Sequence, residues 1–577
     1  MRKLSVIAAL VLCYPALLLS ALWPAPVLFG LIATASYAAE YALPRFARGF
    51  ADMLGKVHVG LTLRFAVRET AALLLVARTA GPDSAWFVAL AVGVFGVHAV
   101  RAVQAGLAGR LRSTLSRMPV TTRNLDVSAL RIPKMPPRFL GNAGGTRFLY
   151  LDALPVLGAA FGAATAALGA GLALVLGVAG AVALVPYVRR ARPLTDKARV
   201  MEVVGAQVKA YEPEVILYFS GASAAAYQAR MWLPVLERID RRAIVVLRER
   251  GMARHLEPTS LPMVCIPSSA DLMSFHELYS AKLCLYVSNV GRNVHMLRIP
   301  TLRSAFLNHG DSDKEASFNP FSRVYDEVWV AGPAGRDRYR KARVGVRDEC
   351  IHEVGRPQLE GISTEGPGLP YRTVLYAPTW EGWNDDLMHS SLITMGPRIV
   401  RALLDHQPPL RIIYKPHPLT GHRDKSATRA HRRIVAMIEA AELATSKARH
   451  PSSRSGGTRV RHLVVTGREP HLYDCFNQCD MMITDISSVV ADFLASEKPY
   501  AVTNVAGMPE AAFHERYPST EAGVLLDADL AGLGAFLDGE DTLARARVKL
   551  RAYLLGPDYP DPLTRFNAAV ERAFSDS

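Results

Sequence analysis

The stretch that decides the fold is Cys479-Asp-Met-Met-Ile-Thr-Asp-Ile-Ser-Ser-Val-Val-Ala-Asp-Phe-Leu-Ala-Ser-Glu-Lys-Pro-Tyr500. The short apolar run from Met481 to Thr484 is typical of a buried strand in a parallel sheet. Polar residues follow it and lead into an apolar pattern of helical period, which predicts a tight turn and a helix capped by Ser487 or Ser488. A second strand is expected from Tyr500. The stretch therefore predicts a strand–turn–helix–strand unit of an α/β domain.

The predicted turn is suited to bind an anion. The first N–H groups of a helix have no partner within it, and the helix dipole is positive there. Ser487 and Ser488 can add hydroxyl donors, so a phosphate or pyrophosphate is the expected ligand. Asp485 belongs to the same phosphate-binding turn, where we expect its carboxylate to fix the backbone, because it would repel an anion. An ordinary α/β unit with a well-capped helix is the alternative that the turn alone leaves open.

Three motifs in this sequence resemble the CDP-glycerol glycerophosphotransferase family, whose members build poly(polyol phosphate) chains of the teichoic-acid type. They are Leu375-Tyr-Ala-Pro-Thr-Trp380, Ile413-Tyr-Lys-Pro-His-Pro418 and Asp480-x-x-Ile483-Thr-Asp485-x-Ser487-Ser488-x-x-x-Asp492-Phe493. A fainter match is Asn308-His309-Gly310 with Lys314 behind it. Together the matches span roughly residues 210 to 550. The resemblance implies a GT-B fold, in which two Rossmann-like domains face each other across a cleft.

Apolar runs that alternate with helical patterns predict the same fold class from the residues themselves. The expected strands are 215–219, 243–247, 263–266, 283–287, 304–307 and 327–330, followed by 373–376, 411–414, 462–465, 481–484 and 500–503. We therefore predict an acceptor-side domain over 196–350 and a donor nucleotide-binding domain over 351–577. Residues 446–461, rich in Ser, Gly and Arg, are expected to form a flexible basic insertion.

Composition limits the classes of partner. The chain has 577 residues, a net charge of +15 and a pI of about 9.6, which indicates anionic partners. The basic residues crowd the edges of the apolar runs and the loops, so binding to nucleic acid is disfavoured. The 6 cysteines have no CxxC spacing, which indicates neither a zinc site nor a disulfide framework. No metal site or cofactor is expected, although a Mg²⁺ ion held by the substrate stays compatible with the sequence.

The first 195 residues are predicted to form a membrane region of about six spans, since each span needs about 20 apolar residues. The candidates are 4–22, 25–43, 60–80, 85–107, 150–168 and 171–188. The third is the weakest, because Arg64, Arg68 and Glu69 lie in its first turns. The positive-inside rule places the amino terminus and everything after Arg189 in the cytoplasm, and four spans would give the same final orientation. We expect the basic segment 110–147 to lie on anionic lipid of the inner leaflet.

His309 is the predicted catalytic base, which would take the proton of the acceptor hydroxyl. It follows an expected strand, and an imidazole titrates near working pH. A lone histidine is more often structural, and the His-Gly motif favours the functional interpretation. Asp311 stands where the family commonly has a small hydroxyl residue, and its carboxylate would either raise the pKa of His309 or contact a polyol hydroxyl.

The Lys-Pro-His-Pro motif is expected at the donor. The resemblance implies that His417 acts at the pyrophosphate of the donor, with Lys415 near it. The two prolines hold the chain extended, so the two side chains are expected on the same side. The resemblance also implies that Thr379 and Trp380 line the cleft.

Two departures from the family pattern concern the donor site. Glu381 follows Trp380, where the family usually has a basic residue. The usual Gly-x-Pro-Arg-x-Asp appears as Gly355-Arg356-Pro357-Gln358-Leu359-Glu360, so Arg356 is predicted to supply the missing cation for donor phosphate.

These patterns predict a membrane-anchored, cytoplasm-facing transferase. The expected reaction moves a polyol phosphate, with glycerol phosphate favoured, from a CDP-polyol to a hydroxyl of a lipid-linked or polymeric acceptor and releases CMP. Its setting would be teichoic-acid-like or capsular polymer synthesis. The alternatives are a GT-B glycosyltransferase that uses a nucleotide sugar, or a non-catalytic membrane protein that binds nucleotide or polymer.

Overall fold

The computed structural model describes residues 2–141, 147–256, 258–382, 389–447, 460–467 and 469–575. The chain divides into two compact units. The first, here called the helical unit, comprises Met1–Pro119 and Asp126–Val203, and the second, the two-sheet unit, comprises Val120–Leu125 and Val204–Ser577. Most of the predicted basic insertion 446–461, namely residues 448–459, lies outside the described residues.

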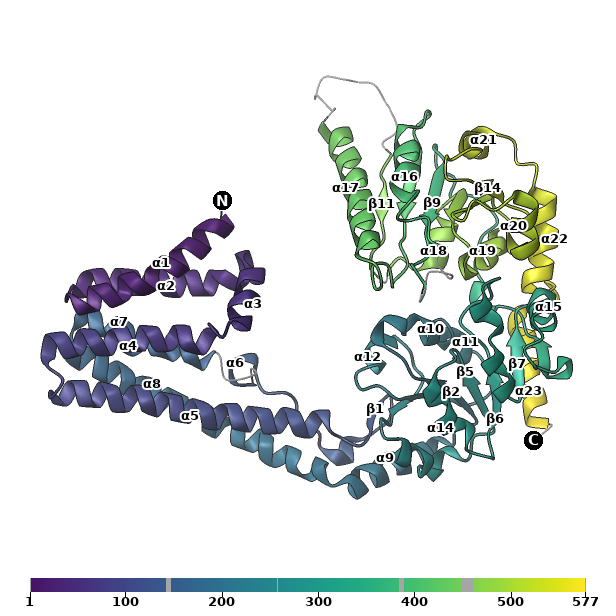
Figure 1. Ribbon diagram of the computed structural model, residues 1–577. Coiled ribbons are helices and arrows are strands. Elements are labelled where there is room, and N and C mark those ends of the chain that lie inside the picture. The colour runs from purple at the N-terminus through teal and green to yellow at the C-terminus, as the bar shows by residue number, and fades with distance from the viewer. Residues whose placement is uncertain are drawn as a thin grey trace. The chain divides into compact units, whose positions relative to one another are not determined.

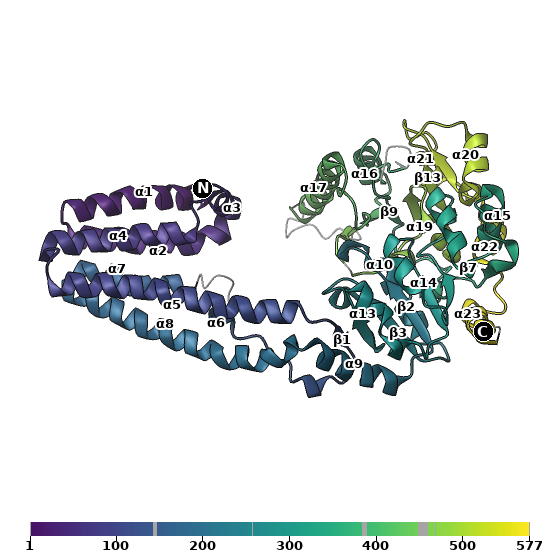
Figure 2. The same ribbon diagram turned by 60° about the horizontal axis from the view of Figure 1, so that its bottom comes forward.

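The helical unit consists mainly of α-helices. They are α1 (Arg2–Leu22), α2 (Pro26–Phe46), α3 (Arg48–Lys56), α4 (Leu61–Ala80), α5 (Ala85–Ser116), α6 (Arg138–Gly141), α7 (Ala153–Gly158) and α8 (Ala163–Ala191), and α9 (Lys197–Tyr211) leads into the two-sheet unit. The connection from α5 to α6 contains β1 (Thr121–Arg123). Figure 2 shows α5 and α8 side by side along much of their length.

Four helices in the described part of the chain are long and apolar enough to cross a membrane. They are Leu4–Leu22, Pro26–Phe46, Ala85–Ser116 and Ala163–Thr195. They cover the predicted spans 4–22, 25–43, 85–107 and 171–188. The predicted span 60–80 forms α4, which is not among the four and carries the charged residues noted above.

The predicted span 150–168 is wrong, because the chain reverses inside it. Gly162, with a φ of +126°, separates the short apolar helix Phe148–Phe161 from α8. Residues with a side chain rarely adopt this φ. The reversal lets α7 pack closely against α8, and a Cβ on Gly169 would lie 2.6 Å from the carbonyl oxygen of Leu154.

The first sheet of the two-sheet unit has eight strands in the order β1-β4-β3-β2-β5-β6-β7-β8. From β4 to β7 this is the strand order of a Rossmann fold, and all pairs but β1–β4 are parallel. The strands are β1 (Thr121–Arg123), β2 (Val215–Phe219), β3 (Ala243–Leu247), β4 (Met263–Cys265), β5 (Leu283–Tyr286), β6 (Arg303–Phe306), β7 (Glu327–Val330) and β8 (Ile351–Glu353).

Strand β1 comes from the segment between α5 and α6 and was not predicted. It pairs antiparallel with β4, with Thr121 opposite Cys265 and Arg123 opposite Met263. The side-chain amide of Asn124 then donates to two carbonyl oxygens of the chain that leads into β4, at 2.8 and 2.9 Å. The segment that was expected on lipid therefore contributes an edge strand to the first sheet.

The second sheet has six parallel strands in the order β11-β10-β9-β12-β13-β14, which is again the Rossmann order. The strands are β9 (Thr373–Ala377), β10 (Arg411–Tyr414), β11 (Leu463–Val464), β12 (Met481–Thr484), β13 (Tyr500–Thr503) and β14 (Val524–Leu526). The predicted fold class, an N-terminal helical region followed by two Rossmann-like domains of GT-B type, is confirmed.

Helices cover both faces of the second sheet, as in a doubly wound domain (Figure 1). Helices α18, α19 and α22 pack on one face, and α16, α17 and α21 pack on the other. The helices of the two-sheet unit are α10 (Tyr227–Arg230), α11 (Leu233–Leu236), α12 (Ala253–Leu256), α13 (Ser269–Met273), α14 (Val294–Leu297), α15 (Pro333–Ala342), α16 (Gly396–Asp405), α17 (Lys425–Lys447), α18 (Leu472–Asn477), α19 (Ser488–Phe493), α20 (Glu510–Arg516), α21 (Leu533–Asp538), α22 (Ala544–Leu555) and α23 (Pro562–Ser575).

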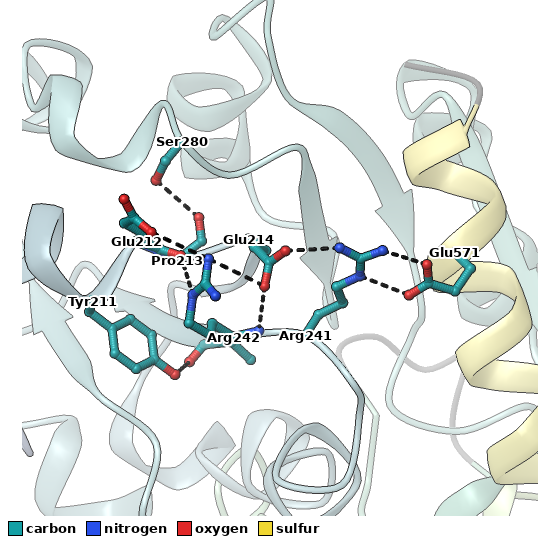
Figure 3. Close-up of polar contacts among 9 residues, drawn as sticks. Tyr211, Glu212, Pro213, Glu214, Arg241, Arg242, Ser280 and Glu571 are labelled. Atoms are coloured by element: carbon teal, nitrogen blue, oxygen red, sulfur yellow. Dashed lines mark hydrogen bonds and ion pairs between the residues drawn. The ribbon is translucent and has the colours of Figure 1, made fainter.

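Helix α23 packs with the first sheet, although it follows the whole second sheet in the chain (Figure 1). The buried ring of Phe566 contacts Trp232 and Trp329, with ring centroids 5.6 and 5.3 Å apart. At the surface, Arg241 bridges Glu214 of the first domain and Glu571 of α23, with hydrogen bonds of 2.5 to 2.9 Å (Figure 3). Both β8 and α23 fall within the predicted donor domain 351–577, yet both pack with the first sheet.

Candidate active site

The predicted site residues follow the carboxyl ends of strands close to the points where strand order reverses. In open α/β sheets, ligands bind at this edge, beside the reversal. The first sheet reverses between β2 and β5, and the second between β9 and β12. The residues concerned are His309 after β6, Thr379 and Trp380 after β9, Lys415 and His417 after β10, and Asp485, Ser487 and Ser488 after β12.

The hydrogen bonds of His309 determine which ring nitrogen can act as a base. Its Nδ1 lies 2.9 Å from the carbonyl oxygen of Val287, which only accepts, so Nδ1 carries the proton. Nε2 therefore keeps its lone pair, and it lies 3.4 Å from the side-chain amide nitrogen of Gln228. Burial lowers the pKa of His309 below its usual value. The neutral ring thus offers Nε2 as a proton acceptor.

Asp311 does not raise the pKa of His309, contrary to one of the two expectations for it. Its carboxylate is buried and accepts a hydrogen bond of 2.9 Å from the backbone N–H of Ala331. The carboxylate thus fixes the loop after β6 to the end of β7.

His417 has the opposite tautomer. The backbone N–H of Leu419 donates to its Nδ1 at 3.1 Å, so the proton of the neutral ring lies on Nε2. Burial, and after it the nearby charge of Lys314, lowers the pKa of His417 to about 3. The indole of Trp380 stacks on the imidazole, with centroids 6.1 Å apart. His417 is therefore a neutral hydrogen-bond donor at Nε2.

Tyr227 on α10 brings the two histidines into one site. Its ring contacts His309 and His417 edge to face, with centroid distances of 5.9 and 5.7 Å. One histidine comes from the first domain and the other from the second, so the site lies between the two sheets of the two-sheet unit. No sequence motif marks Tyr227 or Gln228, so neither residue was predicted.

Lys314 is a site residue to which the sequence analysis gave no role beyond the faint His-Gly match. Its ammonium lies 3.4 Å from the hydroxyl of Thr379. Burial lowers the pKa of Lys314 to about 8, against the opposing effect of the Asp485 carboxylate. Lys314 of the first domain thus places a cation beside the loop after β9 of the second domain.

The carboxylate of Asp485 accepts hydrogen bonds from groups of the second domain. It accepts from the backbone N–H of Thr379 at 2.8 Å and from the hydroxyl of Thr503 at 2.7 Å. Its carboxylate is fully buried, and desolvation raises its pKa above the usual value. These bonds tie the loop after β9 to the end of β12, which is the kind of role expected for Asp485.

The turn after β12 meets the His-Gly loop of the first domain. Ser487 caps α19, because its hydroxyl accepts from the N–H of Val489 at 3.3 Å. A Cβ on Gly310 would lie 2.6 Å from the Cβ of Ser488, so only glycine allows this approach. The predicted phosphate turn and the predicted base loop are therefore in contact.

Two basic side chains that were predicted at the donor phosphate contact groups of the protein instead. The ammonium of Lys415 donates to the carbonyl oxygen of Pro470 at 3.0 Å, so Lys415 and His417 have different neighbours. The guanidinium of Arg356 is buried and pairs with Asp492 of α19, with Nη2 at 2.8 and 3.0 Å from the two carboxylate oxygens. Their predicted contacts with donor phosphate stay predictions.

Glu381 is structural. Its buried carboxylate accepts from the backbone N–H groups of Gly421 and Asp424, at 2.9 to 3.1 Å. A basic residue at this position could not accept these bonds.

Two Rossmann-like domains of GT-B type thus bring an imidazole lone pair on His309, an imidazole N–H on His417 and the ammonium of Lys314 into one site. The sequence model of the CDP-Glycerol:Poly(glycerophosphate) glycerophosphotransferase family matches residues 314–506 of the chain. The resemblance predicted from the motifs is confirmed, and over these residues the chain is similar to the CDP-glycerol glycerophosphotransferases. The comparison with curated proteins found no match.

Solved structures with a similar fold include the wall teichoic acid polymerase TagF and a UDP-GlcNAc 2-epimerase from Neisseria meningitidis bound to UDP-GlcNAc. The TagF match has 14% identity and a TM-score of 0.40, and covers 66% of this chain and 94% of that chain. The epimerase match has 8% identity and a TM-score of 0.38, and covers 63% of this chain and 99% of that chain. At these identities the likeness concerns the fold alone.

Proposed function

We propose that the protein transfers a polyol phosphate, glycerol phosphate in the first instance, from a CDP-polyol to a hydroxyl of a lipid-linked or polymeric acceptor. The observation that carries the proposal is the opposite tautomers of His309 and His417 in one site. Transfer of a phosphoryl group to a hydroxyl needs a lone pair for the hydroxyl proton and N–H donors for the phosphate oxygens. The two histidines supply one of each.

The proposed reaction proceeds by attack of the acceptor oxygen on the distal phosphorus of the donor. The hydroxyl proton passes to Nε2 of His309 as the new P–O bond forms. The bond from that phosphorus to the bridging oxygen breaks, and CMP leaves with the bond electrons. Nε2–H of His417 and the ammonium of Lys314 stabilise charge on the phosphate oxygens, and Ser487 and Ser488 hold donor phosphate through their hydroxyls.

The proposed reaction involves no cofactor bound by the protein itself. In the described part of the chain, no group of three or more His, Cys, Asp or Glu side chains could hold a metal ion. The prediction of no resident metal stays a prediction, and a Mg²⁺ ion carried by the donor is compatible with the proposal.

We further propose that the helical unit is a multi-pass membrane anchor and that the two-sheet unit is cytoplasmic. The pairing of β1 with β4 supports the sidedness, because residues 120–125 and 204–577 belong to one unit and must lie on one side. The chain between them therefore crosses the membrane an even number of times. We propose that Phe148–Phe161, although shorter than a typical span of about 20 residues, is the first arm of a hairpin whose second arm is α8. The basic segment 110–147 supports a cytoplasmic location for this side, by the positive-inside rule.

Charge pairing supports α4 as a further span. Glu40 of α2 accepts from Arg64 at 2.7 Å and from Arg68 at 3.1 Å, and Glu69 lies 2.6 Å from Nε2 of His98. Charged residues inside a membrane pair with one another, because an unpaired charge in lipid is costly. The three charges that weakened this span in the sequence are all paired.

The test of the proposed activity is a comparison of donors with the purified full-length protein. We expect radiolabelled CDP-glycerol to yield CMP and a glycerol phosphate-extended acceptor, and His309→Ala to abolish transfer while binding of CDP-glycerol persists. Turnover with UDP-glucose but not with a CDP-polyol would overturn the proposal in favour of a glycosyltransferase.

A further inference from the structure

Gln228 is the polar side chain that lies against the proton-accepting nitrogen of His309. Its amide Nε2 is 3.4 Å from Nε2 of His309, and the side chain is half-buried on α10. Well-formed hydrogen bonds of this kind are about 2.7–3.2 Å long, so the contact is weak. The other ring nitrogen is held by Val287, which fixes the plane of the imidazole.

We infer that Gln228 positions the acceptor hydroxyl, an inference that rests on the proposed function. A hydroxyl bound at Nε2 of His309 gives its proton to that nitrogen and accepts the amide N–H of Gln228 on one lone pair. Its second lone pair is then free to face the donor phosphorus.

The hydrogen bond from Gln228 affects both the orientation of the acceptor oxygen and the charge that develops on it. Fixing the oxygen by two hydrogen bonds selects the rotamer that can attack, and such alignment removes part of the entropic barrier. Negative charge develops on the oxygen as its proton leaves for His309, and a preformed N–H donor stabilises that charge. Gln228 keeps its own protons throughout, so the proton balance of the reaction is unchanged.

The geometry places Gln228 on the acceptor side of the site. The residue before it, Tyr227, contacts both His309 and His417, so α10 sets the spacing between base and donor-binding histidine. Gln228 contacts the base itself. Its loss should therefore affect acceptor use and leave donor binding intact.

The experiment uses the full-length protein with Gln228→Leu, which keeps the size and removes the donor, and Gln228→Glu, which adds a charge. Ser223→Ala, at an exposed position just before α10, is the matched control. Initial rates are measured against acceptor and against CDP-glycerol, CDP-glycerol binding is measured by calorimetry, and folding is checked by thermal unfolding.

Gln228→Leu should lower kcat/KM for the acceptor by about 10²-fold, the usual effect of removing one such donor, with the Kd for CDP-glycerol within about twofold of wild type. Gln228→Glu should move the acid limb of the rate profile to higher pH, because a carboxylate beside an imidazole raises its pKa. An acceptor kcat/KM within about threefold of wild type in Gln228→Leu, or an acid limb that does not move in Gln228→Glu, would overturn the inference. Absence of transfer from CDP-glycerol in wild type and Ser223→Ala alike would instead refute the proposed function.

Discussion

The two histidines of the site differ in which ring nitrogen carries the proton. Val287 fixes it on Nδ1 of His309, and Leu419 fixes it on Nε2 of His417. Both partners are backbone groups, which every sequence supplies at every position. The motifs therefore predicted which residues meet at the site, while the tautomers that divide their roles depend on where two loops pass.

Motifs also do not reveal the partner of a side chain, which explains the residues whose contacts differ from those expected. The motif position of Arg356 indicated a cation near phosphate, but its guanidinium lies against Asp492, 136 residues away in the chain. Lys314 had only a faint motif behind it, and the site contact with Thr379 spans 65 residues. Side-chain chemistry can be read from a sequence, whereas the choice of partner requires the fold.

The activity should depend on pH through His309 and Lys314. Burial lowers the pKa of His309, so its ring loses the proton at a lower pH than an ordinary imidazole does. As pH rises through this pKa, kcat/KM for CDP-glycerol increases. Above about pH 8, Lys314 loses its charge, because burial lowers its pKa to about 8, and kcat/KM falls. Lys314→Arg keeps the charge at every pH of interest.

The measurement is the profile of kcat/KM against pH for wild type and Lys314→Arg. We expect the alkaline limb to move upward by at least about one pH unit in the variant, with the acid limb unchanged. An alkaline limb at the same pH in both proteins would show that Lys314 is not the group that titrates there.

At the scale of elements, the long apolar runs predicted strands well, whereas three short strands were missed. The run 215–219 became β2 residue for residue. In contrast, β1, β8 and β14 have only 3 residues each, too few to show a period. The partner of β1 also lies about 140 residues further along the chain, so no local pattern marks it.

Helix α4 provides a prediction at this scale. If α4 crosses the membrane, α3 lies on the same side as β1, and the connector between α4 and α5 lies on the other. Cysteine is introduced at the exposed positions Asp52 in α3, Asp83 in the connector and Asp126 after β1. A membrane-impermeant maleimide should label Asp83→Cys in intact cells and the other two variants only after permeabilisation.

Asp52→Cys is the decisive variant, because α5 separates the other two positions whether or not α4 crosses. Labelling of Asp52→Cys in intact cells, at the level of Asp83→Cys and above wild type, would mean that α4 does not cross. The paired charges of Arg64 and Arg68 would then hold together a surface helix.

At the scale of the whole molecule, α23 returns the chain to the first domain after the second is complete. Phe566 packs on Trp232, and the indole N–H of Trp232 donates to the carbonyl oxygen of Asn308 at 2.9 Å. Asn308 precedes the base, so a residue near the end of the described chain supports the position of His309.

Phe566→Ala should destabilise the first domain by about 3–5 kcal/mol, the usual cost of removing a buried phenyl ring. Urea unfolding of the full-length protein, followed by tryptophan fluorescence, measures the change through Trp232 and Trp329. Glu571→Gln is the control on the same helix, and it should cost less than about 1 kcal/mol, because its ion pair with Arg241 is largely exposed. Equal losses in the two variants would mean that the surface pair, and not the apolar core, holds α23.

The return of α23 also sets an order of events during synthesis. The ribosome delivers strands β2 to β8 first, but the core they enclose still lacks Phe566, Ala569, Val570 and Ala573. The second domain leaves the ribosome before α23 does, so it can fold before α23 completes the core of the first domain. If the second domain binds the donor and the first the acceptor, as we propose, the donor half of the site can form before α23 completes the acceptor half.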